Sequence, residues 1–189
     1  MSRFGMDIDG VLANFDRGFL DVLNRVYGKE YTEEDLENKR DWDYFKTLED
    51  LTLEQENDAF KYLGEWFWLR LEPYDQKAML AISLLSEKHN IYFITDRHPN
   101  PTKELTLWQT RKWLEHFNIS PAGVILTKEK PQACKLLGLE YFIDDNVKNV
   151  NNINKTDTKC FVMNKSYNSK CKAERIYSIW DYISIIRGV

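Results

Sequence analysis

The chain has 189 residues, 43% hydrophobic and 30% charged, which is enough to bury a core, and we expect one domain with an inserted subdomain. The formal net charge of −4 argues against binding polymeric nucleic acid by phosphate neutralisation, although it allows a small phosphorylated ligand. The three cysteines lack metal-site spacing, and no apolar stretch resembles a membrane span or a signal-peptide core. We therefore expect reduced thiols, no membrane partner and a cytoplasmic location.

Two carboxylates follow the first predicted strand. Residues 4–6 form a short apolar run, and Asp7 and Asp9 come directly after it. Side chains two residues apart at the end of a strand point the same way. Such a pair can hold a divalent cation and also present a free carboxylate as a nucleophile. A solvated surface turn fits poorly, because Val11 and Leu12 follow immediately.

The next segment changes character. Apolar residues between positions 15 and 26 recur at helical spacing, and Gly28 ends the predicted helix. Residues 29–66 are rich in charged and aromatic side chains, contain no convincing strand, and begin helices at Thr32 and Thr52. We interpret this stretch as a helical insertion after the first strand.

From residue 73 onward, strands and helices alternate. Strands are predicted at 91–95, 124–126, 141–144 and 160–163, and helices at 76–89, 105–117, 131–137 and from Ser178 to the end of the chain. The polar run 149–158 is interpreted as a loop and a fraying turn. This alternation predicts an α/β fold, a three-layer Rossmann-like arrangement in which helices cover both faces of a parallel sheet.

Polar groups stand at the predicted strand ends, where ligands bind in such sheets. In chain order they are Asp7 and Asp9, Thr95, Lys130 a few residues after the third strand, and the pair Asp144 and Asp145. If the first and fourth strands are neighbours, like charges ~4 Å apart repel by about 4 kcal/mol at an effective dielectric of ~20. We expect a cation between them, and Mg²⁺ prefers such oxygen ligands.

These groups together predict a phosphoryl-transfer site. Asp7 would attack phosphorus and form an aspartyl-phosphate. Asp9 would protonate the leaving alkoxide and later activate water. Thr95 would hydrogen-bond a phosphate oxygen, Lys130 would offset charge, and the second acidic pair would anchor Mg²⁺.

The order Asp-x-Asp, Thr, Lys, Asp-Asp resembles the four motifs of the haloacid dehalogenase (HAD) superfamily of phosphatases, and the insertion resembles its helical cap. More narrowly, Phe-Trp-Leu-Arg-Leu-Glu-Pro at 67–73 and Leu-Thr-Lys-Glu-Lys at 126–130 are similar to the 5′(3′)-deoxyribonucleotidases. The resemblance covers most of residues 4–150. It implies a HAD core formed by residues 1–15 and 74–189, with a cap at 16–73.

The resemblance also implies an activity, the Mg²⁺-dependent hydrolysis of (deoxy)nucleoside monophosphates to nucleoside and phosphate, as in deoxyribonucleotide catabolism. It implies Mg²⁺ bound by Asp7, the Asp9 carbonyl and the second acidic pair, and it selects Lys130 over Lys128 as the motif lysine. The partner is then a small nucleotide rather than a polymer.

Substrate recognition is expected from aromatic residues in or beside the insertion. The resemblance places Phe67 and Trp68 there, and we add Trp42 from the insertion itself. A base stacked on an aromatic face gains ~1–3 kcal/mol. For any single aromatic residue the alternative, packing within the cap's own core, stays open.

Two positions depart from the family pattern. The motif threonine is usually followed by a small hydroxyl residue and Pro, whereas this chain has Asp96 and Arg97. We expect Arg97 to supply a substitute charge, and we include Asp96 with it among the phosphate-binding residues. The basic residue that usually follows the acidic pair is replaced by Asn146.

Two other hypotheses remain. The same chemistry could act on a sugar phosphate or a polynucleotide 3′-phosphate, and the negative net charge weakens the latter. A non-catalytic phospho-acceptor module uses similar residues, but its acidic pair comes first along the chain and it has no cap. Base, sugar and 5′ or 3′ preference stay open, as do the metal ligand within the second acidic pair and the oligomeric state, for which a homodimer is one option.

Overall fold

One six-stranded parallel sheet organises the chain. The computed structural model describes residues 2–188, and its strands lie in the order β3-β2-β1-β4-β5-β6. The strands are β1 (Arg3–Met6), β2 (Asn90–Thr95), β3 (Gly123–Leu126), β4 (Tyr141–Asp144), β5 (Lys159–Met163) and β6 (Arg175–Ile176). The predicted strands are therefore all present, and β6 is added at the edge.

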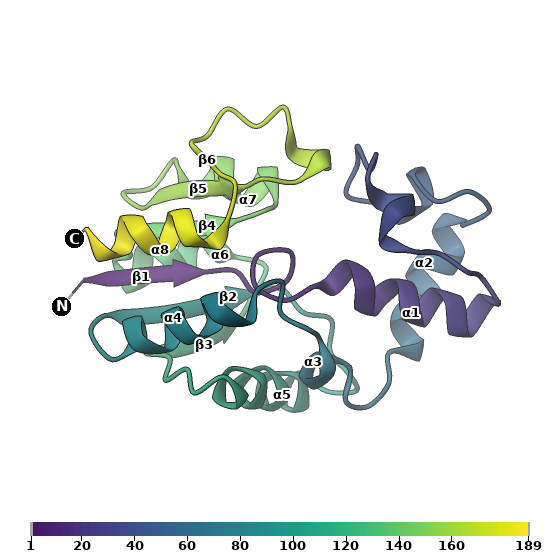
Figure 1. Cartoon of the computed structure of the whole chain (residues 1–189), viewed down its shortest axis with the longest axis horizontal. Helices are drawn as coiled ribbons and strands as arrows, with labels where there is room; N and C mark the ends of the chain where they lie inside the picture. The colour runs from purple at the N-terminus through teal and green to yellow at the C-terminus, as the bar shows by residue number, and fades with distance from the viewer. Residues whose placement is uncertain (1, 189) are drawn as a thin grey trace.

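The strand order reverses beside β1. The chain runs outward from β1 to β2 and β3, then returns to pair β4 on the other side of β1 (Figure 1). Asp7 N, just past β1, donates to Ile143 O of β4 at 2.9 Å, which continues the pairing to the strand ends. Ligands of open α/β sheets bind at such a reversal, outside the carboxyl ends of the strands.

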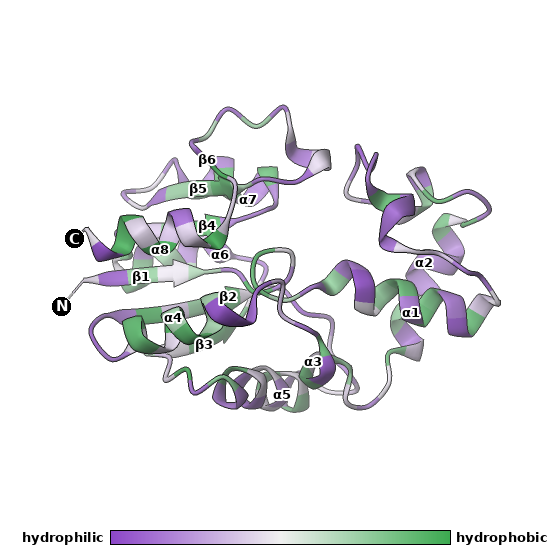
Figure 2. Cartoon of the chain, viewed as in Figure 1, coloured by the Kyte–Doolittle hydropathy of each residue, from purple (hydrophilic) through white to green (hydrophobic). Residues whose placement is uncertain are grey.

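Helices cover both faces of the sheet, as predicted. On one face, α4 (Gln76–Ser86), α5 (Lys103–His116) and α8 (Ile179–Arg187) share a core with Ile143 and Phe161. On the other, α6 (Lys130–Leu137) and α7 (Val147–Ile153) supply buried residues to a second core that contains Phe142 and Cys160. Neighbouring residues of β4 and β5 thus serve opposite faces, and Figure 2 shows hydrophobic residues along these strands. None of the helices in residues 2–188 is both long and apolar enough to cross a membrane.

The inserted segment forms a separate helical group beside the carboxyl end of the sheet (Figure 1). It contains α1 (Phe15–Tyr27) and α2 (Leu53–Ala59), with short 3-10 turns η1 (Glu33–Leu36), η2 (Tyr44–Lys46) and η3 (Phe60–Tyr62). The returning chain forms α3 (Phe67–Arg70), which lies beside α5 (Figure 1). Gly28 ends α1 with φ 64, and the Thr52 side chain accepts from Gln55 N to begin α2. Thr32 begins only the 3-10 turn η1.

The segment in which the chain leaves the sheet for the insertion and the segment in which it returns are joined by backbone hydrogen bonds. Asn14 N donates to Glu72 O at 2.8 Å, and Tyr74 N donates to Leu12 O at 2.9 Å. The returning chain, including α3, packs on α5, where Trp113 Nε1 donates to Leu71 O at 2.7 Å. Although we grouped α3 with the cap, its contacts therefore include the core helix α5.

One predicted loop is wrong. Residues 147–153 form α7, which begins where the Asn146 side chain accepts from Lys148 N and Asn149 N at 3.0 and 3.2 Å. Only Val150 and Ile153 of this helix are buried, so the polar sequence carries little helical periodicity. Asn146, which departs from the family pattern, is thus a helix cap. A further turn, η4 (Ser166–Asn168), follows β5.

Candidate active site

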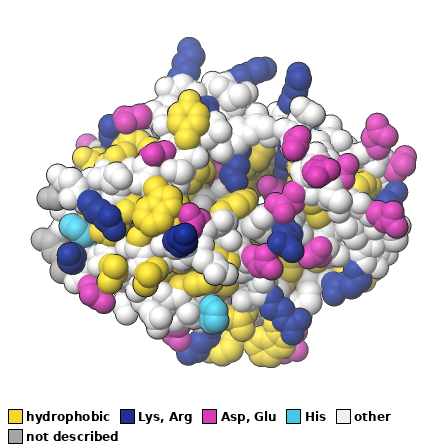
Figure 3. All heavy atoms as spheres, viewed as in Figure 1, with side chains coloured by type: hydrophobic (Ala, Val, Ile, Leu, Met, Phe, Trp, Pro, Cys, Tyr) yellow, Lys and Arg dark blue, Asp and Glu magenta, His cyan; other side chains and the backbone are white. Residues whose placement is uncertain are grey.

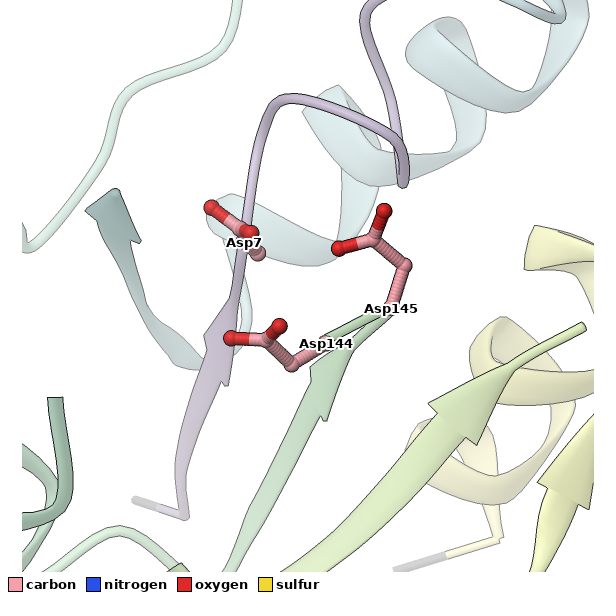
Figure 4. Close-up of side chains that lie close together, drawn as sticks. All are labelled: Asp7, Asp144 and Asp145. Atoms are coloured by element: carbon pink, nitrogen blue, oxygen red, sulfur yellow. The ribbon is translucent and has the colours of Figure 1, made fainter. Parts of the chain in front are cut away.

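Three buried carboxylates meet at the strand reversal. Asp7 follows β1, Asp144 ends β4 and Asp145 follows it. Each offers a carboxylate oxygen within 4.8 Å of the other two, and Figure 4 shows the three groups converging between β1 and β4. The sequence predicted this convergence from the two acidic pairs, and it depends on β1 and β4 being neighbours.

Lys130 lies among these carboxylates. Its Nζ is 2.7 Å from Asp7 Oδ2 and 2.8 Å from Asp144 Oδ2, and the residue is 2% exposed. Burial by itself would lower the pKa of Lys130, but the two carboxylates raise it above its ordinary value. Lys130 therefore pairs with Asp7 and Asp144 as a buried cation.

One cation does not balance three carboxylates. Burial raises the pKa of Asp7 well above its ordinary range, and the charges of Asp144, Asp145 and Asp9 raise it further against the effect of Lys130. Burial and the neighbouring Asp144 raise the pKa of Asp145 to about 7. The site is thus short of positive charge when its carboxylates are ionised.

The donor set fits Mg²⁺. Asp145 Oδ1 is buried and has no hydrogen-bond partner among the described residues, whereas Asp144 accepts from Lys130 Nζ, from Asn146 N at 2.8 Å and from Asn149 Nδ2. Hard carboxylate oxygens in a buried cluster are the ligands that this ion prefers. Asp145 Oδ1 is therefore the unpartnered oxygen of the cluster, whereas Asp7 Oδ1 accepts from Ile8 N at 2.7 Å and Asp7 Oδ2 lies 2.7 Å from Lys130 Nζ.

Asp9 faces a different partner. Arg97 Nε donates to Asp9 Oδ2 at 2.8 Å, Arg97 Nη2 donates to Asp9 Oδ1 at 2.7 Å, and Thr95 Oγ1 lies 3.3 Å from Oδ2. The Asp9 carboxylate is therefore outside the metal cluster. We correct the expectation for Arg97, which contacts Asp9 and does not line the cleft beside the site.

A cleft of about 610 Å³ opens over these groups and lies between the strand ends and the insertion. The predicted residues that line it are Asp7, Asp9, Trp42, Trp68, Thr95, Asp96, Lys130 and Asp145. Phe67 is again a correction, because it lies outside this lining and packs edge-on against Phe15, with ring centroids 5.9 Å apart. The Phe67 and Trp68 rings pack edge-on, with centroids 4.9 Å apart, but of the two only Trp68 lines the cleft.

Sequence reasoning missed a second layer of the site. The Tyr167 hydroxyl donates to Asp145 Oδ2, and Asn168 Nδ2 donates to the Asp145 carbonyl at 2.8 Å. The Trp42 ring packs edge-on against Tyr167, with ring centroids 5.5 Å apart, so the insertion meets the segment that holds Asp145. Tyr167 carries no signal in the sequence, since it lies 22 residues from Asp145 and beyond the family resemblance.

The insertion contributes charged groups to the cleft. Lys39 is 3% exposed, with its Nζ 3.4 Å from both Asp16 Oδ1 and the centroid of the Tyr44 ring. Burial lowers the pKa of Lys39, although Asp16 opposes this effect. These residues lie in the charged, aromatic stretch that sequence reasoning left without assigned roles.

Comparisons with known proteins agree with this geometry. A sequence model of the family described as "5′ nucleotidase, deoxy (Pyrimidine), cytosolic type C protein" matches residues 2–188. A nucleotidase of Clostridium acetobutylicum is 24% identical over 178 residues, covering 94% of this chain and 88% of that protein. A protein of Oceanobacillus iheyensis with a provisional nucleotidase name is 25% identical over 192 residues, covering 97% and 98%.

Solved structures share the fold. A haloacid dehalogenase-like hydrolase from Streptococcus pneumoniae aligns with a TM-score of 0.65 at 12% identity, covering 98% of each chain. A D,D-heptose 1,7-bisphosphate phosphatase from B. bronchiseptica, complexed with magnesium and phosphate, aligns with a TM-score of 0.55 at 5% identity, covering 100% of this chain and 99% of that one. At these identities the likeness concerns the fold.

Proposed function

This chain belongs to the cytosolic type C family of 5′ deoxynucleotidases within the HAD-type hydrolases, and from that premise we propose that it hydrolyses (deoxy)nucleoside monophosphates to nucleoside and phosphate. The observation that carries the proposal is the position of Asp7. Its carboxylate lines the cleft at the end of β1 while Lys130 holds its Oδ2 at 2.7 Å. A carboxylate oriented in this way can attack a phosphorus atom bound above it.

Each neighbouring group then has a role in phosphoryl transfer. Asp7 attacks phosphorus, and the bond from phosphorus to the leaving oxygen breaks as Asp9 donates a proton to that oxygen. Water, losing a proton to Asp9, then attacks the aspartyl-phosphate, which releases phosphate and restores the Asp7 carboxylate. Thr95 and Lys130 bind phosphate oxygens, and the cationic Lys130 offsets their charge.

We include Mg²⁺ as the cofactor. The unpartnered Asp145 Oδ1 and the excess of carboxylates support this assignment, and a related fold was solved with magnesium and phosphate bound. When bound, the ion would neutralise the carboxylates and polarise the phosphoryl group. Asp7 and Asp145 would hold it, supported by Asp144.

The cleft supports a nucleotide-sized substrate. Its volume of about 610 Å³ lies in the range of ligand sites, and Trp42, which lines it and is 49% exposed, provides an aromatic surface for a base. Trp68 corrects our expectation, because it is 2% exposed, with its ring stacked on Phe15 and its Nε1 donating to His98 O at 3.1 Å, and so has no free face for a base. Figure 3 shows acidic side chains gathered on the side of the molecule that carries α1 and α2. Such a surface would repel a polynucleotide, so a small monophosphate is the better match.

A phosphate-release screen tests the proposal. Ribo- and deoxyribonucleoside 5′- and 3′-monophosphates are compared with sugar phosphates, with Mg²⁺ and with excess chelator. We expect release from one or more nucleotides in Mg²⁺ alone, and none from the Asp7→Asn variant. Hydrolysis of sugar phosphates without nucleotides would contradict the substrate assignment, and full rates in chelator would contradict the metal assignment.

A further inference from the structure

Arg97 is a fully enclosed charged side chain beside the site. Its side chain has 0% exposure, whereas the Asp9 side chain that it binds is 18% exposed and lines the cleft. The two residues are joined by two parallel hydrogen bonds of 2.7 and 2.8 Å. This fork-to-carboxylate geometry is specific to arginine, because a lysine ammonium offers only a point charge.

The surroundings of Arg97 hold its guanidinium in one place. Nη1 donates to Thr110 Oγ1 at 3.0 Å, and that hydroxyl donates to Thr106 O within α5 at 2.7 Å. On another side the Trp68 ring centroid lies 4.8 Å from the Arg97 guanidinium carbon. Contacts with α5 and α3 therefore hold Arg97 in place, and its two hydrogen bonds to Asp9 in turn hold the Asp9 carboxylate in one orientation.

We propose that Arg97 is a positioning residue that fixes the Asp9 carboxylate toward the cleft for proton transfer. The proposal rests on the proposed function, in which Asp9 transfers protons to the leaving oxygen and from water. Arg97 does not line the cleft, so it can affect a bound substrate only through neighbouring side chains. Because Arg97 holds both Asp9 oxygens, the carboxylate keeps one rotamer, and its cleft-facing edge can meet the leaving group.

The dependence of rate on the leaving group tests this role. A nucleoside monophosphate releases an alkoxide that needs a proton, whereas p-nitrophenyl phosphate releases a stable phenolate that needs little help. For Arg97→Lys and Arg97→Gln we expect kcat/KM to fall about 10- to 100-fold on the nucleotide, which is part of the roughly 10²–10⁴-fold that general acid catalysis contributes, and about threefold or less on the aryl phosphate. The ratio between the two substrates should therefore change at least about threefold.

A matched control separates this effect from a general one. Arg111 is the residue after Thr110 on α5 and is exposed, so Arg111→Lys should leave both rates unchanged. Equal losses on both substrates in the Arg97 variants would assign Arg97 a structural role and overturn the proposal. A rise in nucleotide turnover would also overturn it, because Arg97 would then be holding Asp9 away from the substrate.

The Asp9→Asn background separates this proposal from the proposed function. If Asp9→Asn turns over nucleotides normally, the assigned role of Asp9 is wrong. If Asp9→Asn keeps only a small residual turnover of nucleotides while Arg97→Lys keeps the wild-type substrate ratio, only the positioning role is wrong. We expect Arg97→Gln to cost nothing further in Asp9→Asn, and an additional loss there would contradict action through Asp9. Circular dichroism and thermal unfolding monitor folding, and Thr110→Val, which removes one anchor of Arg97, replaces any variant that does not fold.

Discussion

Replacing the proposed nucleophile should abolish activity and yet stabilise the metal-free protein. Asp7→Asn keeps the shape of the side chain and removes its charge. The amide oxygen can still accept from Lys130 Nζ, which lies 2.7 Å from Asp7 Oδ2 in the native protein. The amide nitrogen cannot accept the hydrogen bond that Ile8 N donates to Asp7 Oδ1 at 2.7 Å. That loss of about 1.5–3 kcal/mol is smaller than the several kcal/mol that desolvation of a buried charge costs. The charge that is lost faces two other carboxylates in a buried site, Asp144 and Asp145.

The size of this effect follows from the distances. Each of the two neighbouring carboxylates offers an oxygen within 4.8 Å, so each repels Asp7 by at least about 3.5 kcal/mol at an effective dielectric of ~20. Lys130 at 2.7 Å attracts Asp7 by about 6 kcal/mol on the same scale. The repulsion is slightly larger, and desolvation of the charge adds to it. We expect Asp7→Asn to raise the free energy of unfolding by about 1–3 kcal/mol, in the direction that the raised pKa of Asp7 requires.

Urea unfolding at pH 8 in excess chelator measures this difference. The control is Asp157→Asn, at an exposed position in the loop after α7, for which a change within about 0.5 kcal/mol is expected. In Mg²⁺ the native protein should be more stable than Asp7→Asn, because it gains binding energy from the ion that the variant loses. An Asp7→Asn protein less stable than the native one in chelator would refute the charge balance that we assign to this site.

Three further outcomes follow from the site. Gly10 has a φ of 79°, and a Cβ there would lie 2.0 Å from Asp145 Oδ2. Gly10→Ala should therefore weaken Mg²⁺ binding at least about tenfold, as measured by calorimetry. An unchanged Kd would contradict the assignment of Asp145 as a metal ligand. The pKa of Asp145 is raised to about 7, so the metal-free native state binds more protons than the unfolded chain between about pH 4 and 7. Protonated Asp145 therefore contributes to stability at low pH, and this contribution is lost as the pH rises through 7. Mg²⁺ should therefore raise Tm more at pH 8 than at pH 5, and equal shifts would contradict the assignment. Trp42→Ala should raise KM for nucleotides about 5- to 100-fold if a base stacks on it, with p-nitrophenyl phosphate as the control substrate, and equal changes for both would limit Trp42 to packing.

The elements that the sequence predicted well share a local cause. Gly28 ends α1 because its φ of 64 suits glycine, and Ser178 begins α8 through a capping box with Asp181. The strands β1 and β4 carry apolar runs that end in aspartates. These signals act within a few residues, so they need no knowledge of the rest of the fold.

The wrong predictions concern residues whose local sequence pattern is weak or whose contacts are with distant parts of the chain. Helix α7 is held by an Asn146 cap and only two buried residues, too weak a pattern to outweigh its polar sequence. Phe67 and Trp68 are adjacent aromatic residues, and only the docking of α3 decides that Trp68 faces the cleft. Arg97 looks like a free cation beside the motif threonine until Asp9, 88 residues away, is seen to bind it.

The sequence alone therefore determined which polar groups stand at the candidate site, because carboxylates, a threonine and a lysine at strand ends converge in a parallel sheet of this order. Which groups pair with which was decided only by the tertiary structure. The Arg97–Asp9 fork and the Tyr167–Asp145 hydrogen bond join segments 88 and 22 residues apart. Contacts at such separations depend on how whole helices and strands pack, and no local pattern of residues encodes them.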